Sequence, residues 1–205
     1  MQQPWYSLEP QRLDFAEIEF TSSCNLRCTY CAVSGADYQS IDLPPERYSE
    51  IMDHLKAVGV GMVQLNGHGE TTNMPGWMEA TRPFVENFDC KMICNFGREF
   101  SKAEAEFLSA VKVFHVSIDT ADSATLRKIR RKVTPDMIAG NILRIRMAAM
   151  RTGREPPQFN FIAGIYDKNV FQLPDLARFA HSLGIKAIHF WNLWKMNDID
   201  GAVNV

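Results

Sequence analysis

Residues 15–31 read FAEIEFTSSCNLRCTYC, a short strand-like run followed directly by three cysteines. Cys24, Cys28 and Cys31 are spaced C-x3-C-x2-C, and they account for three of the five cysteines in the chain. These spacings are too short for extended chain between ligands of one metal centre, so the stretch must wrap into a loop. The sequence therefore predicts a metal-binding loop at the carboxyl end of a first strand.

The composition is that of a chain of 205 residues with 46% hydrophobic residues, enough for one large domain with a substantial core. Lys and Arg (22) against Asp and Glu (24) give a net charge of −2, with no overall basic field that would favour nucleic acid as a partner. We find no signal-like N-terminus and no apolar run near the ~20 residues of a membrane span. We therefore expect a cytoplasmic protein without a membrane partner, where a tight cysteine cluster is more typical of a metal or catalytic site than of disulfides.

Short β-branched or aromatic runs alternate with longer segments of helical period, which is typical of a parallel sheet with crossover helices. The predicted strands are 16–21, 62–66, 91–95, 113–118, 158–165 and 187–192. The predicted helices are 44–59, 75–88, 101–110, 123–131, 134–151 and 173–183.

These six strand-helix units are fewer than the eight of a closed (β/α)8 barrel. We predict an α/β fold whose open, curved parallel sheet forms a partial (β/α)6 TIM-like barrel, with a doubly wound sheet as the alternative. The expected boundaries are an N-terminal extension at 1–15, the partial barrel at 16–196 and a tail at 197–205. In either arrangement ligands bind at the carboxyl ends of the strands, so the residues just after each strand are candidates for a site.

Three neighbouring thiols do not complete a structural zinc site, which normally has four protein ligands. No C-x2-C or H-x3-H pair that would supply the missing ligand follows downstream. An iron-sulfur cubane held by three cysteines would instead leave one iron open for a cofactor or substrate. A structural zinc protein is the alternative at this point.

The cysteine motif after the first strand, with Tyr30 before its last cysteine, resembles the cluster loop of the radical S-adenosylmethionine (radical SAM) enzymes. The resemblance covers nearly the whole chain and is nearest to the branch that often carries a SPASM or Twitch extension. It implies a [4Fe-4S] cluster on Cys24, Cys28 and Cys31 whose open iron binds S-adenosylmethionine. In that family the reduced cluster cleaves S-adenosylmethionine to a 5'-deoxyadenosyl radical, which abstracts a substrate hydrogen.

The sequence Asn66-Gly67-His68-Gly69-Glu70 follows the second predicted strand. Glycines let the backbone approach a ligand closely, and a neighbouring carboxylate can accept hydrogen bonds from an ammonium group. The stretch looks like the GGE motif of the family, with His68 in place of a glycine. The resemblance implies that Gly67, His68, Gly69 and Glu70 bind the amino group of S-adenosylmethionine. Taken alone, the stretch would read as an ordinary glycine turn with a solvated glutamate.

The third predicted strand ends at Cys94-Asn95, and Asn95 is short enough to hydrogen-bond a ligand at the edge of the sheet. We expect the Cys94 side chain to point away from that edge. We interpret Cys90 and Cys94 as buried thiols rather than as further cluster ligands.

Alternation in the fourth predicted strand places Ser117 and Asp119 on one face, where they suit the ribose or methionine portion of a nucleoside ligand. The segment 117–131, SIDTADSATLRKIRR, is similar to the S-x-D-x(n)-IR segment of the same branch. The resemblance implies that an arginine of the following helix contacts the cofactor carboxylate, with Arg130 as first choice and Arg131 as second. A solvated basic helix face is the alternative for either arginine.

Two histidines, His115 and His189, fall inside predicted strands, and we interpret them as satisfied interior side chains rather than catalytic bases. The last strand ends at Trp191, Asn192 and Trp194, a position that suits substrate docking. Covering the exposed bottom of an unclosed barrel is the equal alternative for these residues.

The resemblance implies a radical enzyme that acts on a peptide, sugar or other small-molecule substrate, with a one-electron reductant such as flavodoxin or ferredoxin as a partner. SPASM and Twitch domains bind auxiliary clusters through cysteines beyond the sixth strand, whereas this chain has no cysteine after Cys94. We therefore expect either a one-cluster enzyme or the core of a larger SPASM-type peptide-modifying enzyme. A non-catalytic cluster-binding or scaffold module is the alternative function.

Overall fold

The computed structural model of the protein describes residues 13–165 and 167–192. They form one six-stranded sheet in which neighbouring strands are parallel and follow chain order, β1-β2-β3-β4-β5-β6. The strands are β1 (Phe15–Ile18), β2 (Met62–Leu65), β3 (Asp89–Cys94), β4 (Val113–Ser117), β5 (Gln158–Ile165) and β6 (Ile188–Asn192). A doubly wound sheet reverses its strand order at a switch point, so the unbroken order confirms the predicted partial (β/α)6 barrel.

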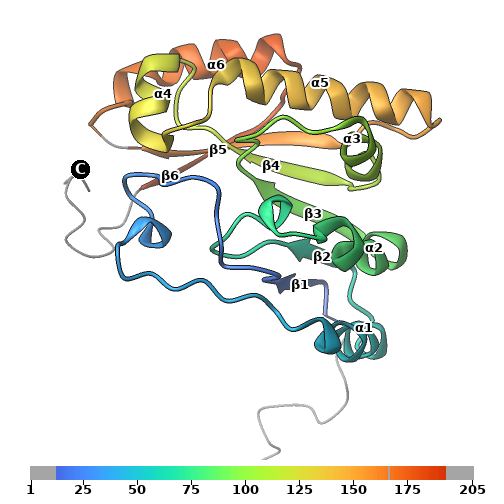
Figure 1. The fold of residues 1–205 in the computed structure, drawn as a ribbon. Helices are drawn as coiled ribbons and strands as arrows, with labels where there is room; N and C mark the ends of the chain where they lie inside the picture. Colours follow the sequence, from blue (N-terminus) through green and yellow to red (C-terminus); the bar gives the residue numbers. More distant parts are fainter. Residues whose placement is uncertain (1–12, 166, 193–205) are drawn as a thin grey trace, which may run out of the picture.

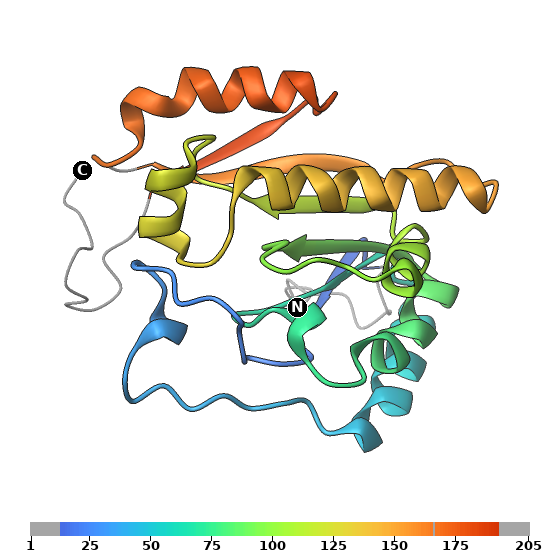
Figure 2. The ribbon, with the colours of Figure 1, turned by 45° about the horizontal axis from the view of Figure 1, so that its top comes forward.

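Helices connect successive strands and cover the convex face of the curved sheet (Figure 1), as the turned view also shows (Figure 2). The helices are α1 (Tyr48–Ala57), α2 (Trp77–Asn87), α3 (Lys102–Leu108), α4 (Ser123–Arg130), α5 (Pro135–Arg151) and α6 (Leu173–Ser182). Short 3-10 turns lie at η1 (Ala32–Ser34), η2 (Pro45–Arg47), η3 (Thr71–Asn73) and η4 (Val170–Gln172). Among the described residues, no helix has the length and apolar character needed to cross a membrane.

The two faces of the sheet differ in polarity because side chains alternate along each strand. On the helix-covered face, Phe114 and Phe161 are fully buried in the hydrophobic core. On the inner face, Glu17, Gln64 and Lys91 form a row of polar side chains in register across β1, β2 and β3. Parallel strands covered by apolar packing on both faces are nearly continuously hydrophobic. The polar row therefore shows that the inner face is not a packed core.

The predicted elements are confirmed with shifts of a few residues at their ends. β1 ends at Ile18 rather than Thr21, because Thr21 has left the sheet to form an antiparallel bridge with Asp42. α4 ends at Arg130, since Arg131 takes a φ of +73° that does not continue a helix. The predicted tail 197–205, Trp194 and the first twelve residues of the predicted extension lie outside the described residues.

Candidate cluster and cofactor site

The loop that carries the three cysteines lies over the carboxyl ends of the strands and is held there from two sides. Its Thr29 N–H donates to the Ile129 carbonyl at the end of α4 (2.9 Å), and the Glu70 N–H after β2 donates to the Ser23 carbonyl (2.8 Å). Leu26, almost fully buried, anchors the middle of the loop in the core. The protein therefore positions this loop through its own contacts with the edge of the sheet.

Cys24, Cys28 and Cys31 all line one cavity of about 200 Å³. In the described part of the chain, no group of three or more His, Cys, Asp or Glu side chains is arranged to hold a single metal ion. The Leu26 N–H and the Asn95 side-chain amide approach Cys24 Sγ at 3.4 and 3.6 Å. Hydrogen bonds to cysteine sulfur are one means by which proteins tune iron-sulfur clusters. Three thiols around one cavity, with N–H donors at a sulfur, form a donor set that fits such a cluster.

Burial alters the acidity of the cysteine thiols in this loop. It raises the pKa of Cys28 to about 11, an effect that the guanidinium of Arg130 opposes, and it also raises the pKa of Cys24. Iron binds thiolates, so loading of a cluster must release these protons. The positive charge of bound iron would compensate for the negative charge of the buried sulfurs.

The loop after β2 forms the wall beside the cysteines, and an added Cβ would meet other atoms closely at two of its glycines, a flexible side chain at one and backbone at the other. A Cβ on Gly69 would lie 2.3 Å from the Thr21 carbonyl oxygen and 2.5 Å from that of Ser23. A Cβ on Gly67 would lie 2.3 Å from the Glu19 side chain. Glycine at Gly69 therefore allows the two loops to pack backbone against backbone.

Glu70 is buried (3% exposed) beside the cysteine loop and lines the same cavity. One of its carboxylate oxygens accepts the Asn95 backbone N–H at 2.7 Å. The other accepts the Thr72 hydroxyl at 2.8 Å and the Cys94 thiol at 3.0 Å. These donors are all neutral, and no cation among the described residues forms an ion pair with Glu70. The β2 side of the cavity therefore carries a fixed carboxylate that is hydrogen-bonded but not neutralised.

Cys90 and Cys94 are both buried, as predicted, but the expected direction of Cys94 is wrong. The Cys94 side chain lines the cavity and donates to Glu70 instead of pointing away from the sheet edge. Burial, followed by the charge of Glu70, raises the pKa of the Cys94 thiol, which keeps its proton for this hydrogen bond. The reason for the difference is that η3 brings Glu70 back under the end of β3.

At the end of β4, Asp119 is fully buried and forms an ion pair with Arg130, which is 7% exposed. The Arg130 Nε–Asp119 Oδ2 distance is 2.7 Å and the Nη2–Oδ1 distance is 3.2 Å. The Tyr30 hydroxyl (3.0 Å) and the Gly164 N–H (2.9 Å) also donate to this carboxylate. The Arg130 guanidinium lies over the Tyr30 ring, 5.6 Å from its centroid. Burial alone would lower the pKa of Arg130, but the Asp119 carboxylate and the neighbouring Tyr30 and Cys28 raise it, so the guanidinium stays protonated.

The structure gives different positions to Ser117, Asp119 and Arg130, which the sequence predicted to contact the same ligand. Arg130 and Ser117 line the cavity, whereas Asp119 lies behind Arg130 with its oxygens already occupied. We therefore revise the predicted ribose contact of Asp119 and assign it to positioning Arg130. Arg131 is exposed and does not line the cavity, whereas Arg130 does; the contact of Arg130 with a cofactor carboxylate stays a prediction. Asn95 also lines the cavity and ties the cysteine loop to the end of β3 through the Asn25 side chain (2.9 Å).

A second, larger cavity of about 670 Å³ occupies the inner face of the sheet, and we call it the lumen. His68 lines both the lumen and the cysteine cavity, so the two spaces meet at that residue. His115 and His189 face the lumen with their rings stacked, centroids 4.9 Å apart. Neither imidazole has a hydrogen-bond partner among the described residues, so the expectation of satisfied interior histidines is wrong. Trp191 also lines the lumen.

Sequence reasoning missed the lumen as a site, although a signal for it was present. Polar residues recur at alternate positions of the first strands, as Glu17 and Glu19 on the β1 segment and Gln64 and Asn66 on the β2 segment. A period of two puts such residues on one face of a sheet. Only the curvature of the sheet turns that face into a cavity.

Comparison with known proteins identifies the family. The model of the radical SAM superfamily matches residues 18–180, which is most of the chain. The chain belongs to the radical SAM superfamily. Members of this superfamily are enzymes whose cofactors are a [4Fe-4S] cluster and S-adenosylmethionine.

Curated relatives of this radical SAM chain are distant and longer. The tungsten-containing aldehyde ferredoxin oxidoreductase cofactor-modifying protein of Pyrococcus furiosus is 25% identical, in a match that covers 94% of this chain and 57% of that protein. The GTP 3',8-cyclase of Rhizobium etli is 26% identical, with 83% of this chain and 49% of that enzyme covered. The chain thus spans about half the length of the curated relatives it matches.

Solved radical SAM structures share the fold. SuiB of Streptococcus suis bound to S-adenosylmethionine superposes with a TM-score of 0.70 at 18% identity, covering 93% of this chain and 43% of SuiB. The methyltransferase TsrM of Kitasatospora setae, with cobalamin and a [4Fe-4S] cluster bound, gives a TM-score of 0.65 at 14% identity, with 86% of this chain and 34% of TsrM covered.

Proposed function

We propose that this chain is the catalytic core of a radical SAM enzyme, with a [4Fe-4S] cluster on Cys24, Cys28 and Cys31 and S-adenosylmethionine beside it. When bound, these cofactors supply a 5'-deoxyadenosyl radical that abstracts a hydrogen atom from the substrate. The observation that carries the proposal is that the three cysteines, Glu70 and Arg130 line one cavity although they come from three separate segments of the chain.

The charges around the cavity suit the zwitterionic end of S-adenosylmethionine. Glu70 provides a carboxylate without a cationic partner on the β2 side, and Arg130 provides a guanidinium on the β4 side. An amino group is attracted to the first and a carboxylate to the second. Asn95 and Ser117, which lie between them around the cavity, offer neutral hydrogen-bonding groups for the ribose.

Other residues of the site shape the cavity or hold neighbouring side chains in position. Gly67 and Gly69 line the cofactor cavity, and Gly69 lets the loop after β2 pack backbone against backbone on the cysteine loop. His68 lines both the cofactor cavity and the lumen, a position from which it would contact both ligands. Tyr30 and Asp119 hold the Arg130 guanidinium at the cavity wall.

Anaerobic reconstitution with iron and sulfide tests the cofactor assignment. We expect about four irons per chain and release of 5'-deoxyadenosine when the loaded protein is reduced in the presence of S-adenosylmethionine. Cys28→Ala should lose the cluster, and Cys90→Ala, which removes a buried thiol outside the cavity, should keep it. One zinc per chain without cleavage would contradict the proposal. A cluster without any 5'-deoxyadenosine would favour the non-catalytic module.

The substrate of the proposed enzyme is a peptide or a small polar molecule whose reacting part enters the lumen. One fold relative, SuiB, has been solved with its precursor peptide SuiA, at a TM-score of 0.68 and 18% identity. Curated relatives include cyclases of GTP by their names. The lumen adjoins the cysteine cavity and has room for such a group, which supports its use by either class.

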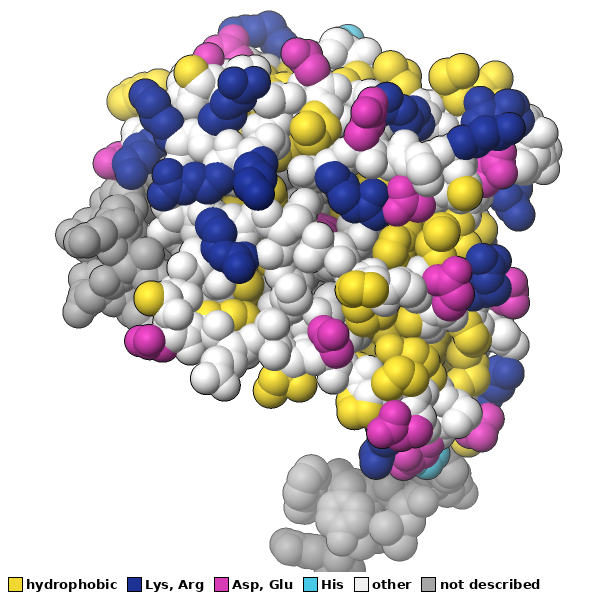
Figure 3. Space-filling model, viewed as in Figure 1, with side chains coloured by type: hydrophobic (Ala, Val, Ile, Leu, Met, Phe, Trp, Pro, Cys, Tyr) yellow, Lys and Arg dark blue, Asp and Glu magenta, His cyan; other side chains and the backbone are white. Residues whose placement is uncertain are grey.

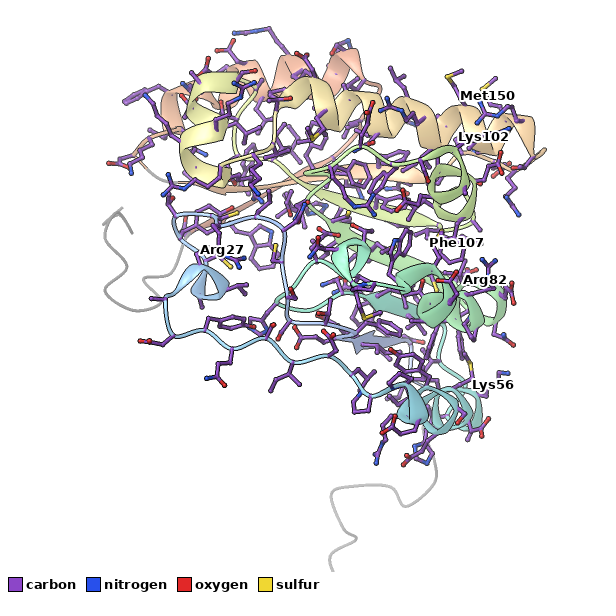
Figure 4. The ribbon with its side chains drawn as sticks, in the orientation of Figure 1. Arg27, Lys56, Arg82, Lys102, Phe107 and Met150 are labelled. Carbon is purple, nitrogen blue, oxygen red and sulfur yellow. The ribbon has the colours of Figure 1, made fainter. Side chains whose placement is uncertain are left out.

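The proposed enzyme also needs a one-electron reductant such as flavodoxin or ferredoxin, and a basic surface next to the cysteine loop suits an acidic partner. The residues of this basic surface are all exposed: Arg27, Arg127, Lys128, Arg131 and Lys132. Figure 3 shows dark-blue side chains gathered over α4 and the adjoining loop, and Figure 4 places Arg27 beside the sulfur atoms of that loop. Opposite charges on two proteins accelerate their encounter.

Charge reversal at Arg127 and Lys128 tests this surface. The rate of S-adenosylmethionine cleavage supported by reduced flavodoxin should fall about tenfold at low salt, and its dependence on ionic strength should weaken. The rate supported by dithionite should stay unchanged, because a small reductant needs no docking. Lys56→Glu on α1, remote from the loop (Figure 4), is the matched control. Equal losses with both reductants would contradict a docking role.

A further inference from the structure

The lumen contains a lysine without a counter-ion. Lys91 projects from β3 into the cavity, and its ammonium forms no ion pair or hydrogen bond with the described residues. The ammonium lies over the ring of Phe15, whose centroid is 5.6 Å from Nζ. Burial lowers the pKa of Lys91 and the charge of Glu17 opposes that shift. A partly buried cation in a cavity is stabilised when an anion joins it.

The carboxylates that share the lumen are already occupied by other donors. Glu17 accepts the side-chain amide of Gln64 at 2.7 Å, and Gln64 stands between Glu17 and Lys91 in the row across the sheet. Glu19 accepts the backbone N–H of His68. Glu17 and Glu19 are therefore hydrogen-bonded by uncharged donors, and the charged side chain of the lumen that lacks a hydrogen bond or ion pair with the described residues is Lys91.

The stacked histidines lie next to this lysine and add hydrogen-bonding capacity. Register pairs Lys91 with Val113, two residues before His115 on the same face of β4, and His189 stacks on His115 from β6. Burial, with Lys91 and His189 nearby, lowers the pKa of His115 to about 4. At neutral pH the His115 imidazole is therefore uncharged and offers one N–H donor without adding a second repelling charge.

We propose that the lumen takes its substrate through an anionic group, a carboxylate or a phosphate, that pairs with Lys91 and accepts hydrogen bonds from His115 and His189. This inference rests on the proposed function and names the chemistry that would recognise the substrate. Charge-assisted hydrogen bonds from an ammonium to either anion are strong and directional. The anion would hold one end of the substrate at the middle of the sheet.

The position of this anion site gives the substrate a direction. The lumen and the cysteine cavity share Gly67, His68 and Ile93, which lie at the carboxyl end of the strands above Lys91. A substrate anchored at Lys91 therefore extends its far end toward the cofactor cavity. The hydrogen-donating carbon is then several bonds away from the anionic group, at the junction of the two cavities.

Calorimetric titration tests the anion site on the iron-loaded protein saturated with S-adenosylmethionine. The probes are pyrophosphate and succinate at constant ionic strength and neutral pH, with putrescine as a dication of similar length. We expect at least one anion to bind, Lys91→Met to weaken that binding at least about tenfold, and Lys91→Arg to keep it within a few fold. Lys56→Met on the outer surface is the matched control and should bind like the unmodified protein.

Each outcome of this titration decides for or against the site. Tighter pyrophosphate binding assigns a phosphate to it, and tighter succinate binding assigns a carboxylate. Anion binding that is unchanged in Lys91→Met, or binding of putrescine alone, or no binding at all, would overturn the proposal. The titration requires no cleavage of S-adenosylmethionine. Anion binding without 5'-deoxyadenosine formation would count against the proposed function only, and the reverse result against the anion site only.

Discussion

The cysteine end of the barrel and the lumen are both polar, but they satisfy their polar groups differently. At the cysteine end, Glu70 and Asp119 are buried, and their carboxylates accept hydrogen bonds from the surrounding chain. In the lumen, Lys91, His115 and His189 have no hydrogen-bond partner among the described residues. A buried group with all its partners contributes to the native fold, whereas an unpaired group in an open cavity contributes to binding.

Because of this difference, substitutions at the cysteine end and in the lumen should change different measured quantities. Changes at the cysteine end should reduce the free energy of unfolding even without cofactor, because they leave buried partners unsatisfied. Changes in the lumen should alter ligand binding and leave stability nearly unchanged.

The largest effect is expected for Asp119→Ala. It leaves the Arg130 guanidinium buried without its partner, so the free energy of unfolding should fall by about 3–5 kcal/mol. Urea denaturation of the iron-free protein measures it. Asp175→Ala breaks an exposed pair with Arg178 and should change stability by less than about 1 kcal/mol. Similar values for Asp119→Ala and Asp175→Ala would show that the buried pair adds nothing to the fold.

A smaller but clear loss is expected for Gly69→Ala. The added methyl would meet backbone oxygens at 2.3 and 2.5 Å, so the cysteine loop must shift and stability should fall by about 1–3 kcal/mol. Iron content after reconstitution should fall as well. Gly140→Ala in α5 meets only the flexible end of Arg144 and should be neutral or stabilising, by up to about 1 kcal/mol. Full iron loading in Gly69→Ala would contradict the close packing of the two loops.

Glu70→Gln should have a moderate effect on stability and a larger one on cofactor binding. Both oxygens of Glu70 accept hydrogen bonds, so the NH2 group of the new glutamine would face a donor and lose that bond. The free energy of unfolding, measured by urea denaturation, should fall by about 1–2 kcal/mol. The affinity for S-adenosylmethionine, measured by equilibrium dialysis on the iron-loaded protein, should fall about tenfold because the negative charge is lost. Glu46→Gln on the exposed η2 turn is the control for both measurements. Unchanged affinity would remove Glu70 from the proposed cofactor site.

The smallest effect is a pH dependence that arises in the lumen. Because His115 has a pKa of about 4 in the folded protein against 6.5 unfolded, the unfolded chain binds more protons between these values. The contribution of His115 to stability is therefore complete above pH 6.5 and is lost as the pH falls toward 4. The slope should be shallow, since the imidazole is partly exposed, and His115→Gln should reduce it further.

Lys91→Met sharpens the same comparison. It removes one of the charges that lower the pKa of His115, so that pKa should lie nearer its value in the unfolded chain. The free energy of unfolding should therefore fall less between pH 6.5 and pH 4 in Lys91→Met than in the unmodified protein. At neutral pH its free energy of unfolding should match that of the unmodified protein within about 0.5 kcal/mol. A loss as large as that of Asp119→Ala would mean that the lumen is part of the core, and the contrast between the regions would fail.

Much of the fold could be predicted because the hydrophobic pattern of each element is local. The six strands and six helices follow from alternating runs of period two and period 3.6, and the ends differ where tertiary contacts intervene. The pairing of Thr21 with Asp42 shortens β1, a contact across twenty-one residues of chain that no local pattern encodes. Residues of the cysteine loop and the loop after β2 were predictable from short motifs with fixed spacing.

Directions of side chains at the site could not be predicted, because they depend on which loops meet. In the structure Asp119 holds Arg130, and Cys94 donates to Glu70. Both contacts form because η3 and α4 fold back over the strand ends. The interpretation of His115 and His189 failed for a similar reason. A strand histidine is satisfied in a flat, covered sheet, whereas here the sheet curves away from it.

The succession of strands and helices and the family can be recognised from the chain alone, since three closely spaced cysteines after a first strand are a local pattern. That Glu70 and Arg130 line the same cavity as the cysteines, and that Lys91 lies without an ion pair beside two stacked imidazoles, follows from how the elements pack together. Parallel strand order and sheet curvature bring together residues that are far apart in the chain, and those two properties arise from packing between elements.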